Sequence, residues 1–217
     1  MQRFYASLKA PRVPAGIRVM NPYKDARATR YTTAFLDTFF DDRRPRTLIF
    51  GINPGRFGAG ITGITFTDPI ALSDFCGIKN HLPRHRELSS VFIYDVIAAL
   101  GGPRAFYKRF LLTAICPLGF TRNDVNLNYY DVPSLKKAAT PFIVASIERH
   151  IAMGGRRDRA IVLGLGQNAK YLRALNEHHG FFDVIHALEH PRFILQYRRK
   201  RVAEYVRKYV GVLTDGD

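Results

Sequence analysis

Residues 51–68, GINPGRFGAGITGITFTD, are the stretch that decides how this chain folds. They follow a short apolar run at residues 47–50, which is typical of a buried parallel strand. The five glycines of the stretch let the backbone of an α/β protein approach a ligand closely at the end of such a strand. Its polar side chains are few, with Asn53 first, and Phe57 and Phe66 supply flat apolar surface. The stretch therefore predicts a site that holds a planar ligand beside one oriented amide.

Outward from this stretch, apolar strands alternate with helices of helical hydrophobic spacing. This alternation predicts a single domain over residues 1–217, folded as a three-layer α/β/α sandwich with a short, mostly parallel central sheet. We expect an irregular N-terminal arm at residues 1–26, a polar loop at 119–131 and a basic C-terminal helix at 196–210. The predicted strands are residues 47–52, 111–116, 159–164 and 181–188, and the other predicted helices are 29–40, 68–76, 87–100, 104–110, 133–152 and 168–178.

The composition is strongly basic, with 33 Lys and Arg against 18 Asp and Glu and a formal net charge of +15. A basic protein of this size attracts polyanions, of which nucleic acid is the commonest inside cells. No apolar run is long enough for a membrane span, so we expect no membrane partner. Cys76 and Cys116 are too few for an iron–sulfur cluster with four thiolates and suggest no disulfide framework. We expect a cytoplasmic protein, associated with the bacterial nucleoid.

Residues 51–68 resemble, without a gap, the pattern GMNPGPFGMxQTGVPFGE, the first motif of the uracil-DNA glycosylase superfamily. Within it, the chain is most similar to the single-strand-selective monofunctional uracil-DNA glycosylases. His190-Pro191-Arg192 resembles the family's HPSPR loop, and Cys116-Pro117-Leu118 resembles its CPL segment. The resemblance implies a uracil-DNA glycosylase-like fold and a monofunctional DNA glycosylase for base excision repair. Such an enzyme hydrolyses the N-glycosidic bond of uracil or a related deaminated or oxidised base, with xanthine and 5-hydroxymethyluracil as candidates.

The resemblance also implies roles for individual residues. Asn53 would hold the attacking water, although an amide cannot act as a strong general base. His190 would stabilise the negative charge of the departing base, and Phe66 would stack on the extruded base. The base-binding pocket would comprise Gly51, Ile52, Pro54, Gly55, Phe57, Gly63, Phe66, Ala114, Cys116 and Pro117. The DNA-binding residues would be Arg56, Arg122, Asn126, Arg192, Phe193, Arg198, Arg199 and Lys200.

Two departures from the family pattern bear on specificity. Ala114 stands where the family carries an Asn that reads the edge of uracil, so one bidentate specificity contact is missing. We therefore expect a broader or shifted range of bases. The HPSPR loop is shortened to His-Pro-Arg-Phe, which leaves both Arg192 and Phe193 as candidates for the wedge that enters the DNA.

Three other features of the sequence suggest different functions. Residues 164–169 fit GxGxxA, with Asp183 nineteen residues after Gly164, as in a dinucleotide site; Asp183, however, lies near the start of the next predicted strand. Residues 186–190 fit the zinc-hydrolase pattern HxxEH, which requires a helix where a strand is expected. A non-catalytic basic nucleic-acid-binding α/β protein stays open as the third class. We expect a monomer that binds DNA, single- or double-stranded, and needs no metal or organic cofactor.

Overall fold

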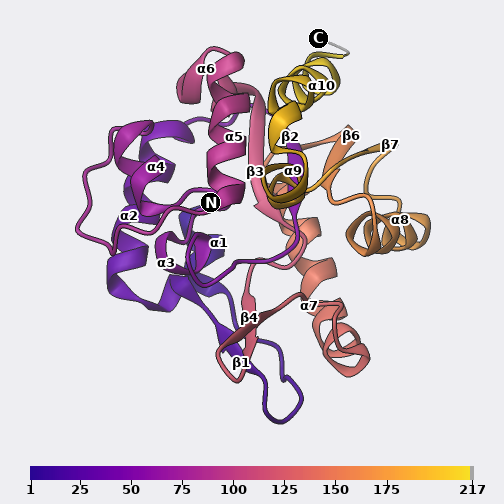
Figure 1. Cartoon of the computed structure of the whole chain (residues 1–217). Helices are drawn as coiled ribbons and strands as arrows, with labels where there is room; N and C mark the ends of the chain where they lie inside the picture. The colour runs from indigo at the N-terminus through magenta and orange to yellow at the C-terminus, as the bar shows by residue number, and fades with distance from the viewer. Residues whose placement is uncertain (216–217) are drawn as a thin grey trace.

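The computed structural model describes residues 1–215, and its centre is a sheet of four parallel strands (Figure 1). The strands are β2 (Arg46–Gly51), β3 (Phe110–Ala114), β6 (Gly155–Leu163) and β7 (Val184–Leu188), in the order β3-β2-β6-β7. Every residue of β2 and β3 is buried, as expected for strands covered by helices on both faces. The predicted parallel sheet is confirmed, with strand ends that differ by at most four residues.

The helices form the two outer layers. The chain runs from β2 to β3 in one direction across the sheet and from β3 through β6 to β7 in the other, so right-handed crossovers place the connecting helices on opposite faces. The first crossover contains α5 (Leu88–Ala99) and α6 (Gly102–Arg109), and the later ones contain α7 (Pro133–Ala152) and α8 (Gln167–His179). The predicted three-layer α/β/α arrangement is confirmed.

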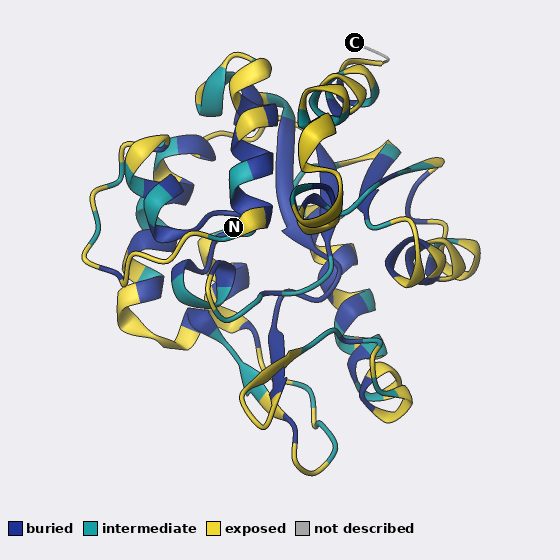
Figure 2. Cartoon of the chain, viewed as in Figure 1, coloured by how far each residue is buried: buried dark blue, intermediate teal, exposed yellow. Residues whose placement is uncertain are grey.

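The last two helices join the layer of α5. Both α9 (Pro191–Tyr197) and α10 (Val202–Thr214) pack against α5, and the rings of Phe92 and Tyr209 meet edge to face at 4.9 Å. Figure 2 shows the central strands β2 and β3 buried and much of the surface of α9 and α10 exposed. None of the helices in residues 1–215 is both long and apolar enough to cross a membrane.

Three further helices lie on the α5 and α6 side of the molecule. The helix α2 (Ala26–Phe39) packs against α6, α4 (Pro69–Asp74) packs against α5, and α3 (Ala59–Thr62) packs against α2. Asp25 and Asp68 cap α2 and α4 by accepting hydrogen bonds from backbone N–H groups of the first turn. Tyr107 of α6 packs among aromatic rings of α2, at 5.1 Å from Phe35 and 5.0 Å from Phe39.

The expected irregular arm at residues 1–26 is wrong in detail. It contains α1 (Gln2–Ser7), the short strand β1 (Arg18–Met20) and the 3₁₀ turn η1 (Pro22–Lys24). A six-residue helix has little stability of its own, so packing forms it. Phe4 meets the His150 ring at 4.8 Å, and Tyr5 stacks on Tyr23 at 4.6 Å.

The expected polar loop at residues 119–131 is also corrected. It holds β4 (Gly119–Arg122) and β5 (Val125–Leu127), which form with β1 a small antiparallel sheet in the order β1-β4-β5. The two strands are joined by Asn123 and Asp124, whose φ angles of 50° and 57° are those of a tight hairpin turn. Three- and four-residue strands are too short to show a clear alternation in sequence.

The single basic helix expected at residues 196–210 is interrupted. Arg198 ends α9, the 3₁₀ turn η2 (Arg199–Arg201) follows, and α10 continues to Thr214. Four successive cations would repel one another along a continuous helix, and cations oppose the dipole at the start of α10. The break leaves Arg198, Arg199 and Lys200 exposed at a corner of the fold.

Candidate active site

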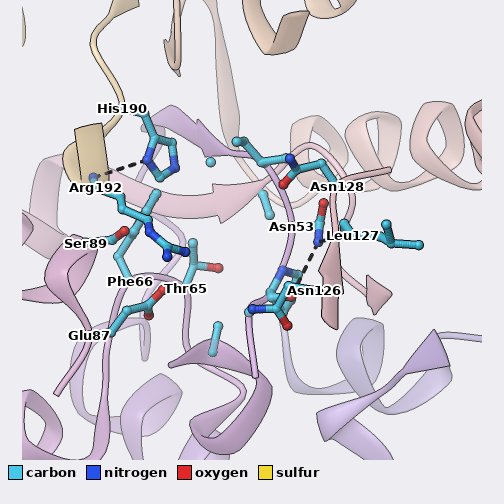
Figure 3. A pocket seen from close by; sticks show the side chains of 16 residues that line it. Asn53, Thr65, Phe66, Glu87, Ser89, Asn126, Leu127, Asn128, His190 and Arg192 are labelled. Atoms are coloured by element: carbon cyan, nitrogen blue, oxygen red, sulfur yellow. Dashed lines mark hydrogen bonds between the residues drawn. The ribbon is translucent and has the colours of Figure 1, made fainter. Parts of the chain in front are cut away.

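The site lies at the carboxyl ends of the parallel strands. Asn53 follows β2 by two residues and His190 follows β7 by two residues, while Ala114 ends β3 and pairs in register with Gly51. These ends surround a cavity of about 230 Å³ (Figure 3). Its lining residues are Gly51, Ile52, Asn53, Pro54, Gly55, Ala59, Thr65, Phe66, Glu87, Ser89, Ala114, Asn126, Leu127, Asn128, His190 and Arg192.

Two backbone hydrogen bonds fix the Asn53 side chain. Its Oδ1 accepts from the N–H of Tyr129 at 3.0 Å, and its Nδ2 donates to the carbonyl of Leu127 at 3.1 Å. The reversed amide would place donor against donor, so this pair of bonds sets the orientation. One lone pair of Oδ1 stays available for a further hydrogen bond. Asn53 is therefore a pre-oriented acceptor on one wall of the cavity.

His190 is held at the opposite wall as the N-cap residue of α9. Its Nδ1 accepts the backbone N–H of Arg192 at 3.2 Å, so in the neutral ring the proton is on Nε2. Burial, together with the charge of Arg192, lowers the pKa of His190 to about 4. The ring is consequently neutral near pH 7, and its Nε2–H is a hydrogen-bond donor.

Phe66 supplies the flat apolar surface of the cavity, next to His190. It is 8% exposed, and its ring centroid lies 5.9 Å from that of His190. The ring lies so close over Gly51 that a Cβ there would be 2.8 Å from it, which only glycine tolerates. Phe66 also has a φ of 55°, a left-handed conformation that costs a non-glycine residue energy and is often found at functional sites.

Glu87 and Ser89 line the cavity but were not predicted from the sequence. Both lie about twenty residues beyond the glycine-rich motif, in a segment with no pattern of its own, at the start of α5. Asp68 accepts the backbone N–H of Glu87 at 2.8 Å and so ties this segment to the motif. The Glu87 carboxyl lies where a Cβ on Gly58 would clash with it, at 1.7 Å. Burial, and next the charge of Asp68, raise the pKa of Glu87 to about 7.

Four residues predicted for the base pocket lie outside this cavity. Phe57 lines an adjoining cavity instead. Gly63 ends α3 with a φ of 72° against Thr32, so its role is in a turn. Cys116 is fully buried and continues the β2–β3 pairing, and burial raises the pKa of its thiol to about 12. Pro117 follows it beneath the surface.

The residues predicted to bind DNA lie in three places. Arg56, Asn126 and Arg192 line the adjoining cavity, and the last two also line the first one. Phe193 is 39% exposed on α9, with the Arg198 guanidinium 5.3 Å from its ring. Arg199 and Lys200 follow in η2. Arg122 is exposed on the β4–β5 hairpin and lines neither cavity, because the segment predicted as a loop carries it away on a strand.

The two motif alternatives do not have the geometry they require. The Asn168 side chain is buried at the start of α8 and donates to the carbonyls of Leu163 and Gly51, so the protein itself fills the crevice beside the GxGxxA glycines. Asp183 precedes β7, at the amino end of the sheet, away from any ligand at the carboxyl ends. His186 lies in β7, so the HxxEH residues are not on a helix. Within residues 1–215, no group of three His, Cys, Asp or Glu side chains could hold a metal ion.

Comparison with known proteins agrees with this geometry. The sequence model of the uracil DNA glycosylase superfamily matches residues 38–214. The chain therefore belongs to the uracil-DNA glycosylase superfamily, and it is a DNA glycosylase. The crystal structure of wild-type Pedobacter heparinus SMUG2 is similar to it, with 42% sequence identity, a TM-score of 0.94, and coverage of 97% of this chain and 94% of that chain. No curated protein matches the sequence.

Proposed function

We propose that this protein is a monofunctional DNA glycosylase that hydrolyses the N-glycosidic bond of uracil or a related deaminated base, acting in base excision repair. One observation carries the proposal: an oriented amide and a neutral imidazole stand at opposite walls of one cavity, with the Phe66 ring beside the imidazole (Figure 3). The cavity accepts a flipped base. One polar group then lies beside the departing base, and the other lies beside the sugar carbon that is attacked.

The chemistry follows from where charge develops. As the bond between C1′ and the base nitrogen breaks, the base gains negative charge and the sugar gains positive charge. The Nε2–H of His190 donates to a carbonyl oxygen of the departing base and stabilises its anion. A water that donates a hydrogen bond to Asn53 Oδ1 is held facing C1′, and its oxygen forms the new C–O bond there. The proton that this water loses passes to solvent, and the free base is protonated in turn.

We infer that the range of accepted bases includes xanthine and extends beyond uracil. Ala114 presents no amide at the position next to Gly51, so no side chain of β3 reads the edge of a pyrimidine there. The absence of this contact weakens discrimination and leaves space for a purine. 5-Hydroxymethyluracil is a further candidate, because its additional group is small.

The test is single-turnover excision by purified protein from oligonucleotides that carry uracil, xanthine, hypoxanthine or 5-hydroxymethyluracil. Asn53→Ala and His190→Ala are each expected to slow excision by about 10²–10³-fold, the usual cost of losing one such preorganised group. Binding to an abasic-site oligonucleotide should change little, because neither side chain contacts phosphate in this mechanism.

Matched controls are available on the surface. His178→Ala removes an exposed imidazole, and Asn123→Gly removes an exposed amide from a positive-φ position that glycine accommodates. Both should excise normally. If Asn53→Ala and His190→Ala do so as well, the active site is elsewhere. If the wild type binds DNA and releases none of these four bases, the proposed range of bases is wrong.

A further inference from the structure

A second cavity, of about 160 Å³, adjoins the one described above. The two cavities share Gly55, Glu87, Asn126 and Arg192 in their walls. A ligand too long for the first cavity can therefore extend into the second. The second cavity is otherwise lined by Arg56, Phe57, Arg86 and Leu88.

The charge of this second cavity is positive. Three of its lining residues are arginines, at positions 56, 86 and 192, and Glu87 is its one carboxyl group. The raised pKa of Glu87, about 7, reduces its negative charge near neutral pH. The cavity thus suits an anion, and arginine forks suit the oxygens of a phosphate.

The same cavity also offers an exposed aromatic face. Phe57 is 49% exposed, its ring lies 5.4 Å from that of His85, and the Arg56 guanidinium stacks over it at 5.1 Å. Leu88 next to it is 45% exposed. Exposed aromatic rings beside cations are the usual platform for an unpaired base.

Arg56 has an unused donor at this place. Its backbone N–H is bound by the Asn126 side chain at 3.2 Å, which fixes the residue. Its Nε is buried and finds no hydrogen-bond partner among residues 1–215. A buried donor without a partner is uncommon in a folded protein and indicates a missing ligand group.

We propose that this second cavity is a subsite for the nucleotide next to the damaged one on the same strand. The three arginines bind its phosphate, and Phe57 stacks on its base. The inference rests on the proposed function, because it assumes that the first cavity receives the damaged base. It makes Phe57 a residue that reads the neighbour of the lesion.

The experiment is a binding cycle that needs no catalysis. Single-stranded oligonucleotides carry a tetrahydrofuran abasic residue at the centre, and a second series also lacks the base on its 5′ or its 3′ side. For the wild type, loss of the neighbouring base on one side should weaken binding, measured by fluorescence anisotropy, about tenfold. For Phe57→Ala, omission of the same neighbouring base should weaken binding almost no further. Phe75→Ala is the matched control, since Phe75 is 50% exposed and lines neither cavity.

Equal binding with and without the neighbouring base on both sides would overturn the subsite. The subsite would also be overturned if omission of the neighbouring base weakened binding equally in the wild type and in Phe57→Ala. Thermal melting of each variant shows whether it is folded before it is compared. Excision of damaged bases is measured in parallel: a wild type that excises but shows no coupling loses only the subsite, whereas coupling without excision contradicts the proposed function alone.

Discussion

At the residue scale, the site depends on side chains that the backbone holds in place. Asn53 and His190 each use part of their hydrogen-bonding capacity on main-chain groups, and the remaining part faces the cavity. Groups fixed in this way need no reorganisation when charge develops, which is the main source of electrostatic catalysis. Gly51 also helps to build the site, since its missing side chain lets Phe66 lie against the strand.

A prediction at this scale concerns Ala114. Ala114→Asn would place one donor and one acceptor at the position that pairs with Gly51. Uracil excision should then rise relative to xanthine excision by about tenfold or more, because a polar pocket rejects a base that leaves its groups unpaired. The measurement is the ratio of single-turnover rates on the two substrates.

Ala114→Val is the control for that change, because it adds volume to the same position without an amide. It should slow excision of both bases and leave their ratio nearer to the wild-type value. A ratio that Ala114→Asn does not alter would mean that this side chain does not reach the base edge.

At the element scale, His150 joins three segments. It lies on α7, where its Nδ1–H donates to the Ser146 carbonyl at 2.7 Å, and its Nε2 lies 3.0 Å from the Thr113 hydroxyl of β3. Phe4 of α1 packs against its ring. His150 is 1% exposed, so the neutral ring is satisfied on both nitrogens, and a protonated ring would face the hydroxyl with a second donor.

This arrangement predicts a dependence of stability on pH. Burial lowers the pKa of His150 from 6.5 to about 4. The unfolded chain then takes up a proton at a pH where the folded protein does not, so the free energy of unfolding falls as pH drops from the unfolded to the folded pKa. His150 alone should account for a loss of about 3 kcal/mol across that window. Urea unfolding at a series of pH values measures it.

His150→Gln removes the titrating group and keeps an amide that can bond to the same partners. The variant should lose less stability than the wild type between the two pKa values, although it starts lower at neutral pH. His190 adds a loss of the same sign, so His190→Gln is run beside it. A pH slope unchanged by His150→Gln would show that another group causes the acid sensitivity.

At the scale of the whole molecule, the fold determines where the basic side chains behind the net charge of +15 lie. The break between α9 and α10 exposes Arg198, Arg199 and Lys200 at the end of α9, the helix that His190 begins. Exposed cations in this place can bind phosphates and release counterions from the DNA. The alternative is that they form only a solvated face.

The salt dependence of DNA binding distinguishes phosphate contacts from a solvated face. If Arg199 and Lys200 each contact a phosphate, changing both to Gln should make the slope of log binding constant against log salt shallower by about two units at most on duplex DNA. Arg104→Gln with Lys108→Gln removes the same charge from α6, which precedes β3 at the other end of the sheet. The control should keep the wild-type slope, and an equal slope for both double variants would leave the η2 cations without phosphate contacts.

Much of this fold can be predicted from the amino-acid sequence alone. The apolar runs of β2 and β3 and the Pro133 start of α7 are local signals that short-range physics sets, and they were predicted within a few residues. The glycine-rich motif marked Asn53 and Phe66, and its resemblance to a family linked them to His190, which the structure places around the same cavity.

The other features depend on contacts between segments that are distant in sequence. The elements α1, β1, β4 and β5 are too short to be stable alone, so they exist through contacts that no local pattern encodes. The same holds for Glu87, which reaches the cavity because Asp68 binds its backbone, and for Asn53, whose orientation is set by Leu127 and Tyr129, more than seventy residues away in sequence. Hydrophobic periodicity encodes which face of an element is buried, and side-chain packing between distant segments determines what that face meets.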